Sequence, residues 1–278
     1  MIKPIRNTIE LKSIEQIGLM RVAGLVVSRA LGAIREAVAP GVSTLELDSI
    51  AREVLREAGA TSSFLGYHGF PAVICASVND RIVHGIPSAA EILVEGDLIS
   101  IDFGAIVEGW HGDSAITVPV GAVEPLATQM SAACEASMWD GLAAARVGAR
   151  LSDISHAVET SVQSSGRYGI VTGYGGHGIG SQMHMDPHVL NHGRPGRGPR
   201  LQHGMALAIE PMVTLGSPDT RECDDGWTVV TADGSMSAHW EHTVAILDDG
   251  PWVLTAPDGG LAELGARGVG LSAAAAAA

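Results

Sequence analysis

Positive charge is scarce in this chain of 278 residues: Lys and Arg number 17 against 31 Asp and Glu, a formal net charge of −14. Nucleic-acid and anionic-membrane surfaces need clustered cations, so neither class of partner is expected. Cysteine is also rare, and the three thiols, at Cys75, Cys134 and Cys223, form no CxxC pair. Their number and spacing fit neither a zinc ribbon nor a disulfide framework, and they predict a cytoplasmic protein in a reducing environment.

Long apolar runs are missing as well. The N-terminal segment holds no apolar core of a secretory signal, and no uninterrupted apolar stretch approaches the length of a membrane span. Hydrophobic residues still make up 46% of the chain against 17% charged residues, which is enough to build a core. No long polar linker interrupts the sequence, so we predict a single domain over 1–278, with a frayed alanine-rich tail at 265–278.

Helix signals are clear in the first part of the chain. Ser13 with Gln16, and Ser43 with Glu46, form two capping boxes, each followed by apolar residues three and four positions apart. Gly59 stands where a left-handed residue ends the second helix. We therefore expect two amphipathic helices before the first strand.

The second half of the chain repeats this plan after about 107 residues. GDLISID, ending at Asp102, matches GMALAIE, ending at Glu210. The period is too long for a solenoid unit, so it predicts two related halves, about 13–125 and 126–250, in one pseudo-symmetric α+β domain. Coincidence between two generic helix–strand units is the alternative. The expected strands lie at 72–78, 98–107, 110–118, 206–214, 227–231 and 241–247.

The segment GDLISIDFGAIVEGWHGDSAITV predicts a hairpin that turns near Glu108. If its loop has an even number of residues, Asp102 and Asp113 fall on the same face of the two strands. Two semi-buried carboxylates on one face repel each other and need a proton or a cation between them. The alternative is that one aspartate belongs to a turn and the other pairs with an arginine.

Two glutamates favour a cation beside Asp102 and Asp113 over the alternative of a turn residue and an arginine pair. Glu210 in LAIEPMV and Glu241 in HWEHTVAI both lie among apolar neighbours in strand-like segments. A buried glutamate is rare unless it is paired or binds a ligand. Glu210 also occupies the repeat position of Asp102, so it should enter the same space from the other half. Four carboxylates in one cavity predict two divalent cations as the neutralising charge.

A glycine-rich run, GYGGHGIGSQMHMDPHVLN, carries His177 and His184. It matches GxGxxG, but no capped helix follows and no acidic residue lies about 20 positions on, which excludes a dinucleotide site. Glycines on both sides of His177 instead predict a backbone held close to a neighbour. His84, in the turn-rich SVNDRIVHGIPS, is a third candidate, and an ordinary surface or core position is the alternative for each ring. Neither the GxSxG of serine hydrolases nor the HExxH of zincins occurs.

Seven segments carry a resemblance to a known family by their order and spacing: YHGFP (67–71), VNDRIVHGIP (78–87), IDFGAIVEGWHGDSAIT (101–117), GGHGIG (175–180), MHMDPHVL (183–190), IEPMV (209–213) and DGWTVVTADGSMSAHWEHT (225–243). From about Ile9 to Asp249 the chain resembles the type I methionine aminopeptidases, metallopeptidases of the pita-bread fold. The resemblance implies an α+β fold in which a pseudo-two-fold antiparallel sheet carries helices on its outer face.

The same resemblance implies five metal ligands: Asp102, Asp113, His177, Glu210 and Glu241. Asp113 and Glu241 would bridge two divalent ions, and Mn²⁺, Fe²⁺ or Co²⁺ suit one imidazole and four carboxylates better than a structural Zn²⁺. Glu210 would also act as the general base that takes a proton from the attacking water.

The resemblance further implies a substrate site. The catalytic residues that bind no metal would be His84 and His184, which also touch the substrate. The methionine side chain would be surrounded by Tyr67, Phe70, Cys75 and Trp227. Phe64 and Met183 fall at the same pocket, at points where the family often has other residues, so their effect on selectivity stays open.

The implied activity is methionyl aminopeptidase: removal of the initiator methionine from nascent proteins and peptides when the second residue is small. Water activated by the two metal ions would attack the first peptide bond. We expect a cytoplasmic monomer without nucleic-acid or membrane partners, and a ribosome contact stays open. The enzyme alternative is an X-Pro aminopeptidase or prolidase of the same fold, which usually carries an additional N-terminal domain. The other alternative is a non-catalytic pita-bread binding protein, which would lack some of the ligands.

Overall fold

A two-residue turn at Glu108 and Gly109 forms the tip of the central hairpin. Both residues have positive φ, 49° and 82°, the conformation that joins twisted antiparallel strands most directly. The turn connects β4 (Leu98–Val107) to β5 (Trp110–Pro119), and the two strands pair without a break. The predicted hairpin is therefore confirmed, and its loop has the even number of residues that places Asp102 and Asp113 on the same face.

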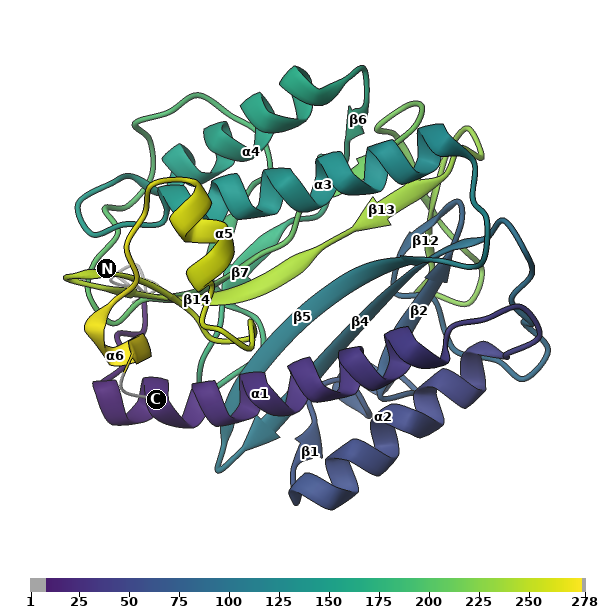
Figure 1. Cartoon of the computed structure of the whole chain (residues 1–278), viewed down its shortest axis with the longest axis horizontal. Helices are drawn as coiled ribbons and strands as arrows, with labels where there is room; N and C mark the ends of the chain where they lie inside the picture. The colour runs from purple at the N-terminus through teal and green to yellow at the C-terminus, as the bar shows by residue number, and fades with distance from the viewer. Residues whose placement is uncertain (1–8, 277–278) are drawn as a thin grey trace, which may run out of the picture.

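The computed structural model describes residues 9–276 and shows this hairpin inside a nine-stranded antiparallel sheet (Figure 1). The strands follow the order β1-β4-β5-β14-β9-β7-β8, with β2 also paired to β4 and β15 to β14. The β5–β14 pair thus joins the two halves of the chain. The remaining strands of this sheet are β1 (Thr61–Ser62), β2 (Ile74–Val78), β7 (Gly176–Gly178), β8 (Met185–Val189), β9 (Ala206–Ile209), β14 (Glu241–Leu247) and β15 (Gly250–Val253).

Two three-stranded sheets flank the large one. One has the order β13-β10-β6 and the other β11-β12-β3, and every pairing in them is antiparallel. Their strands are β3 (Arg81–Val83), β6 (Gly169–Ile170), β10 (Met212–Thr214), β11 (Thr220–Glu222), β12 (Val229–Thr231) and β13 (Ser237–His239). A short 3-10 helix, η1 (Tyr67–Gly69), follows β1.

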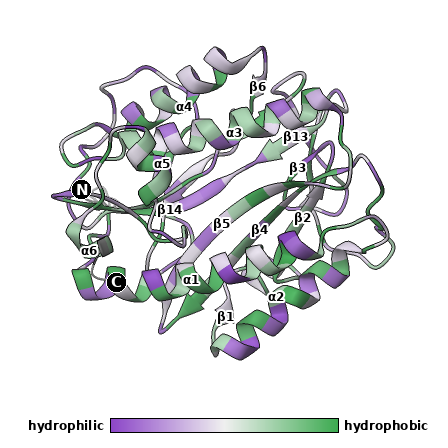
Figure 2. Cartoon of the chain, viewed as in Figure 1, coloured by the Kyte–Doolittle hydropathy of each residue, from purple (hydrophilic) through white to green (hydrophobic). Residues whose placement is uncertain are grey.

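The helices lie on one side of the large sheet, with α1 and α2 over the first half and α3 and α4 over the second (Figure 1). Both predicted capping boxes are present, because Ser13 and Ser43 each accept from the backbone N–H three residues on. Figure 2 shows hydrophobic and hydrophilic residues alternating along α1 and α2. The helices are α1 (Ile14–Ala37), α2 (Thr44–Ala58), α3 (Pro125–Ala144), α4 (Leu151–Ser165), α5 (Leu261–Ala266) and α6 (Ala273–Ala276).

Helix α1 approaches β5 closely where two glycines meet. A Cβ on Gly112 would lie 2.8 Å from the Gly24 nitrogen, and a Cβ on Gly24 would lie 2.2 Å from the Leu254 carbonyl oxygen. Neither position has room for a side chain, so the helix is seated directly on the strand. Because Asp113 follows Gly112, this contact also fixes the position of the Asp113 backbone relative to α1.

Helix α1 is long and apolar enough to cross a membrane by length and composition alone. Half of its most apolar window is buried inside the fold, where Ile17, Met20 and Val27 have no exposed surface. Packing against β4 and β5 accounts for this hydropathy, as expected for the core helix of an α+β domain.

The structure departs from the expected elements in two places. The strand expected over 206–214 is broken at Glu210 and Pro211 into β9 and β10, which belong to different sheets, because proline has no N–H to continue the ladder. The tail expected to fray is ordered over 265–276: Val269 is buried, and α6 packs beside Trp252. The other expected strands shift by no more than two residues at either end.

Candidate metal centre

Strand register gathers the acidic residues on the inner face of the sheet, away from the helices. Asp102 on β4 pairs with Ala115 on β5, and Ala115 pairs in turn with Glu241 on β14, so these three residues form one row across three strands. Asp113 lies two residues before Ala115 and therefore on the same face, diagonal to Asp102. The predicted convergence of these carboxylates is confirmed.

Glu210 enters the same space from the second half of the chain. It follows the last residue of β9 directly, at the break before Pro211, and is only 8% exposed. His177 lies at the middle of β7, between two glycines. A Cβ on Gly176 would lie 2.1 Å from the Ala208 oxygen, and the predicted close approach of this backbone to its neighbour is therefore confirmed.

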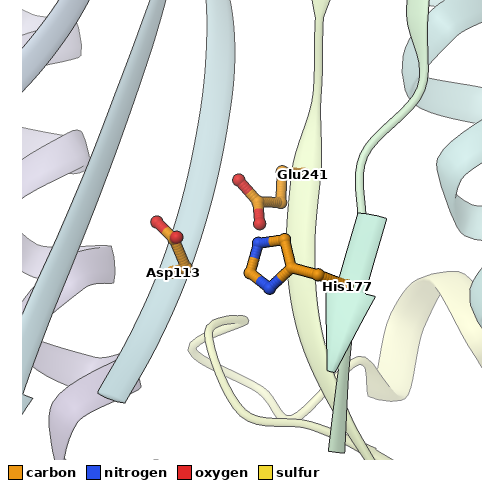
Figure 3. A group of neighbouring side chains, drawn as sticks. All are labelled: Asp113, His177 and Glu241. Atoms are coloured by element: carbon orange, nitrogen blue, oxygen red, sulfur yellow. The ribbon is translucent and has the colours of Figure 1, made fainter. Parts of the chain in front are cut away.

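The His177 ring is held in one orientation. Its Nδ1–H donates to the Gly178 carbonyl oxygen at 3.0 Å, which leaves the Nε2 lone pair free on the cavity side. Nε2 lies 3.4 Å from Glu210 Oε1. Figure 3 shows His177, Asp113 and Glu241 pointing toward one another, and one ligand atom from each lies within 4.8 Å of the others. This is the spacing of donors around a shared cation.

The four carboxylates share a cavity whose lining, in the part of the chain that the structure describes, includes no lysine or arginine to balance their charge. Burial, and then the neighbouring carboxylates, raise the pKa of Asp102, Glu210 and Glu241 well above the usual range, and burial raises the pKa of Asp113 to about 7. Within the described residues, the buried side-chain oxygens without a hydrogen-bond partner include Asp102 Oδ1, Asp113 Oδ1 and Glu241 Oε1. Unpaired buried oxygens together with a free imidazole nitrogen fit a divalent cation.

An apolar pocket opens beside the carboxylates, within the same cavity of about 170 Å³. Its wall is a compact cluster in which the Phe70 and Trp227 rings meet edge to face at 5.0 Å. Every residue of the predicted site lines this one cavity. The lining residues are Phe64, Tyr67, Phe70, Cys75, Val83, His84, Asp102, Asp113, His177, Met183, His184, Glu210, Trp227, His239 and Glu241.

The two further histidines stand at the rim of the cavity. His184 is exposed, and its Nδ1 lies 2.9 Å from the Tyr67 hydroxyl. His84 has φ of 61°, an uncommon conformation for a residue with a side chain, and burial lowers the pKa of its ring. Partial burial, followed by the nearby His84, also lowers the pKa of His184. Both rings are therefore neutral near pH 7, when each carries one N–H donor and one acceptor.

His239 lines the cavity but was not among the site residues predicted from the sequence. It is 2% exposed, and burial lowers the pKa of its ring to about 3. His239 lies two positions before Glu241, and residues two positions apart lie on the same face of an extended segment. This two-residue spacing from a candidate ligand could have predicted His239 from the sequence.

The chain is similar to known metallopeptidases over nearly its whole length. Residues 18–248 match the model of metallopeptidase family M24. A methionine aminopeptidase 1 of Mycobacterium tuberculosis is 58% identical over 255 residues, which cover 90% of this chain and 96% of the relative. The solved structure of a methionine aminopeptidase from Thermotoga maritima superposes with a TM-score of 0.87 at 36% identity, covering 89% of this chain and 99% of that one.

A prolidase from Pyrococcus furiosus shares the fold at lower similarity. Its TM-score is 0.71 at 21% identity, and the matched region covers 92% of this chain but only 67% of the prolidase. The pita-bread fold is common to both groups, whereas the high identities and full coverage are found with the methionine aminopeptidases. The chain belongs to metallopeptidase family M24 and, within it, to the type I methionine aminopeptidases of the pita-bread fold.

Proposed function

We propose that this chain removes the initiator methionine from nascent proteins and peptides whose second residue is small. One observation carries the proposal: an apolar, aromatic-walled pocket and an unpaired carboxylate cluster share a single cavity. Such a cavity binds an apolar side chain on one side and the polar atoms of the first peptide bond on the other.

Two divalent cations complete the proposed site. Asp102, Asp113, His177, Glu210 and Glu241 would hold them, with Asp113 and Glu241 shared. Four carboxylates and one imidazole are mainly hard oxygen donors, which suits Mn²⁺, Fe²⁺ or Co²⁺. When bound, such cations lower the pKa of a water molecule toward neutrality and so supply a nucleophile.

The residues of the chain then divide the proton transfers between them. Glu210 accepts the proton of the attacking water. The Tyr67 hydroxyl lies 2.9 Å from His184 Nδ1. In the tautomer that serves the reaction, this hydroxyl donates to Nδ1, and the His184 proton on Nε2 is donated to the carbonyl oxygen as negative charge develops. His84 contacts the scissile nitrogen and supports the departure of the new amine. Each role uses a group already oriented by the fold.

The side-chain pocket accounts for the choice of methionine. Phe70, Trp227 and Tyr67 surround the space, and Cys75 closes its inner end beside β4. A thioether is flexible and makes favourable contacts with aromatic rings, so methionine fits a narrow pocket of this composition. Phe64 and Met183 belong to the same buried cluster and should tune its width.

Hydrolysis of Met-Ala-Ser by Mn²⁺- or Co²⁺-loaded protein tests the proposal. We expect release of free methionine, little cleavage of Met-Leu-Ser, and no cleavage of N-acetylated Met-Ala-Ser. Equal rates on Met-Ala-Ser and Met-Leu-Ser would contradict the requirement for a small second residue. Preferred cleavage of Ala-Pro-Ser would identify an X-Pro aminopeptidase instead, and a metal-loaded protein that cleaves none of these peptides would be a binding protein.

We also propose that the protein acts as a cytoplasmic monomer on chains that emerge from the ribosome. Three free cysteines and a strongly acidic composition support this location. Sedimentation measures the oligomeric state, and cosedimentation with ribosomes at low and moderate salt measures any contact.

A further inference from the structure

His239 is an imidazole of the metal cavity for which the proposed reaction has no role. It ends β13, is 2% exposed, and lines the same cavity as the five proposed ligands. It lies two positions before Glu241 in the chain, and the register of β13 places it opposite Met212, two positions after Glu210.

The backbone of His239 is fixed to the central hairpin by three hydrogen bonds. Its N–H donates to Thr117 Oγ1 at 3.0 Å and to Ser100 Oγ at 3.2 Å, and the Thr117 hydroxyl donates to the His239 carbonyl oxygen at 2.7 Å. Ser100 and Thr117 pair across β4 and β5, on the same face as Asp102 and Asp113. The ring is thereby placed rigidly relative to the strands that carry the aspartates.

The ring nitrogen Nε2 of His239 is buried and has no hydrogen-bond partner that meets ordinary geometry. Glu210 Oε2 lies 3.5 Å from it, while the other oxygen, Oε1, lies 3.4 Å from His177 Nε2. The Glu210 carboxylate is therefore situated between two imidazoles. Leaving a buried ring nitrogen without a hydrogen-bond partner is unfavourable, so a small closing movement toward Glu210 Oε2 is favourable.

We propose that His239 is a positioning residue of the metal centre, whose Nε2–H donates to Glu210 Oε2 and keeps Oε1 on the His177 side of the cavity. This inference rests on the proposed function, since it assigns a partner to a proposed ligand. Carboxylates that bind metal are commonly oriented by such outer partners, and loss of the partner typically weakens metal affinity about 10–100-fold.

A matched pair of substitutions tests the role of the N–H donor. His239→Gln keeps a donor on a side chain of similar length, whereas His239→Met has nearly the same volume and no donor. His242→Gln is the control, because His242 is a partly buried histidine on β14 whose side chain lies on the opposite face from that of Glu241. Calorimetric titration of Mn²⁺ and the visible absorption of the Co²⁺ form are measured for each variant, together with hydrolysis of Met-Ala-Ser.

We expect His239→Met to bind Mn²⁺ about 10–100-fold more weakly and to change the Co²⁺ spectrum. His239→Gln should restore most of the affinity, and His242→Gln should bind as wild type does. If His239→Met does not fold, as judged by its unfolding transition, His239→Ala replaces it in the same comparison.

Two results would overturn the inference while leaving the proposed function intact. One is a wild-type protein that binds Mn²⁺ and cleaves Met-Ala-Ser beside a His239→Met variant with unchanged affinity and spectrum. The other is spectroscopic evidence for a second imidazole bound directly to the metal and lost in His239→Met, since His239 would then be a ligand. A wild-type protein that neither binds Mn²⁺ nor cleaves the peptide would overturn both proposals together.

Discussion

The polar side chains on the two faces of the β5–β14 strand pair differ in whether they have hydrogen-bond partners. On the outer face, under the helices, Ser114 donates to the Glu241 carbonyl oxygen and lies 3.2 Å from His242 Nδ1, which also contacts Thr255 Oγ1 at 2.7 Å. On the inner face, one residue away on each strand, Asp113 Oδ1 and Glu241 Oε1 have no partner.

Within the β5–β14 pair, the carboxylate oxygens without hydrogen-bond partners lie on the inner face. On the outer face, Ser114 Oγ and Thr255 Oγ1 both lie within hydrogen-bond distance of His242 Nδ1, and Thr255 Oγ1 also accepts from the Thr243 N–H. The fold provides partners for the polar groups of Ser114 and His242 but none, among the residues described, for Asp113 Oδ1 and Glu241 Oε1. Both of these oxygens belong to carboxyl groups whose pKa is raised by burial, because their charged forms lack a compensating partner. Their natural partner is a cation, which a protein chain of this composition must obtain from solution.

The largest expected effect lies on the inner face. Asp113→Asn changes almost no volume but removes one of the charges that a shared cation would need. We expect stoichiometric Mn²⁺ binding and hydrolysis of Met-Ala-Ser to fall to background, as measured by calorimetry and methionine release. Full activity in this variant would contradict the proposed role of the inner face.

A second prediction concerns a donor that binds no metal. His184→Ala should reduce kcat for Met-Ala-Ser by about 10²–10³-fold, because a donor to the developing oxyanion is lost. Mn²⁺ affinity should stay close to that of wild type, which separates this residue from the ligands. A large loss of affinity would place His184 in the metal shell instead.

The third prediction concerns the pH dependence of the stability of the metal-free protein. The pKa of Asp113 is raised to about 7 in the folded protein, above its ordinary value near 4. The folded state then holds more protons than the unfolded state, so this stabilisation is present below about pH 4 and is lost as pH rises through 7. The buried histidines, whose pKa values are lowered, act in the opposite direction below about pH 6.5, so the comparison is made above that pH. Thermal unfolding of chelator-treated protein should show a Tm that falls from about pH 7 to about pH 9 as Asp113 and the other carboxyl groups of raised pKa ionise, and added Mn²⁺ should remove most of that fall. A Tm that is flat or rising in the metal-free protein would contradict the electrostatic account.

The smallest effect on function is expected on the outer face. Thr255→Val removes a hydroxyl that serves His242 and the Thr243 N–H, with little change of shape. We expect a loss of about 1–3 kcal/mol in the free energy of unfolding, measured with denaturant. Mn²⁺ affinity and hydrolysis should match wild type, and a parallel loss of metal binding would show that the two faces are coupled.

Local signals predicted much of this molecule. Capping boxes at Ser13 and Ser43 mark the starts of α1 and α2, because a cap uses only neighbouring atoms. The even turn at Glu108 likewise placed Asp102 and Asp113 on one face without knowledge of the rest of the sheet. Both depend on short stretches of chain whose geometry is independent of distant packing.

Features that depend on tertiary contacts were predicted less completely from the sequence. The break at Pro211 moves the chain from one sheet to another, and pattern alone extended the strand through it. His239 has a distinctive environment only because Ser100, Thr117 and Glu210 converge on it from other strands. The order of the alanine-rich tail likewise depends on a surface beside Trp252 that composition does not reveal.

The proposed ligands are split between the halves of the chain: Asp102 and Asp113 precede α3, whereas His177, Glu210 and Glu241 follow it. Neither half alone therefore carries all five of the proposed ligands. Strand β14 lies between β5 and β9 and so unites both halves of the chain around the proposed metal site.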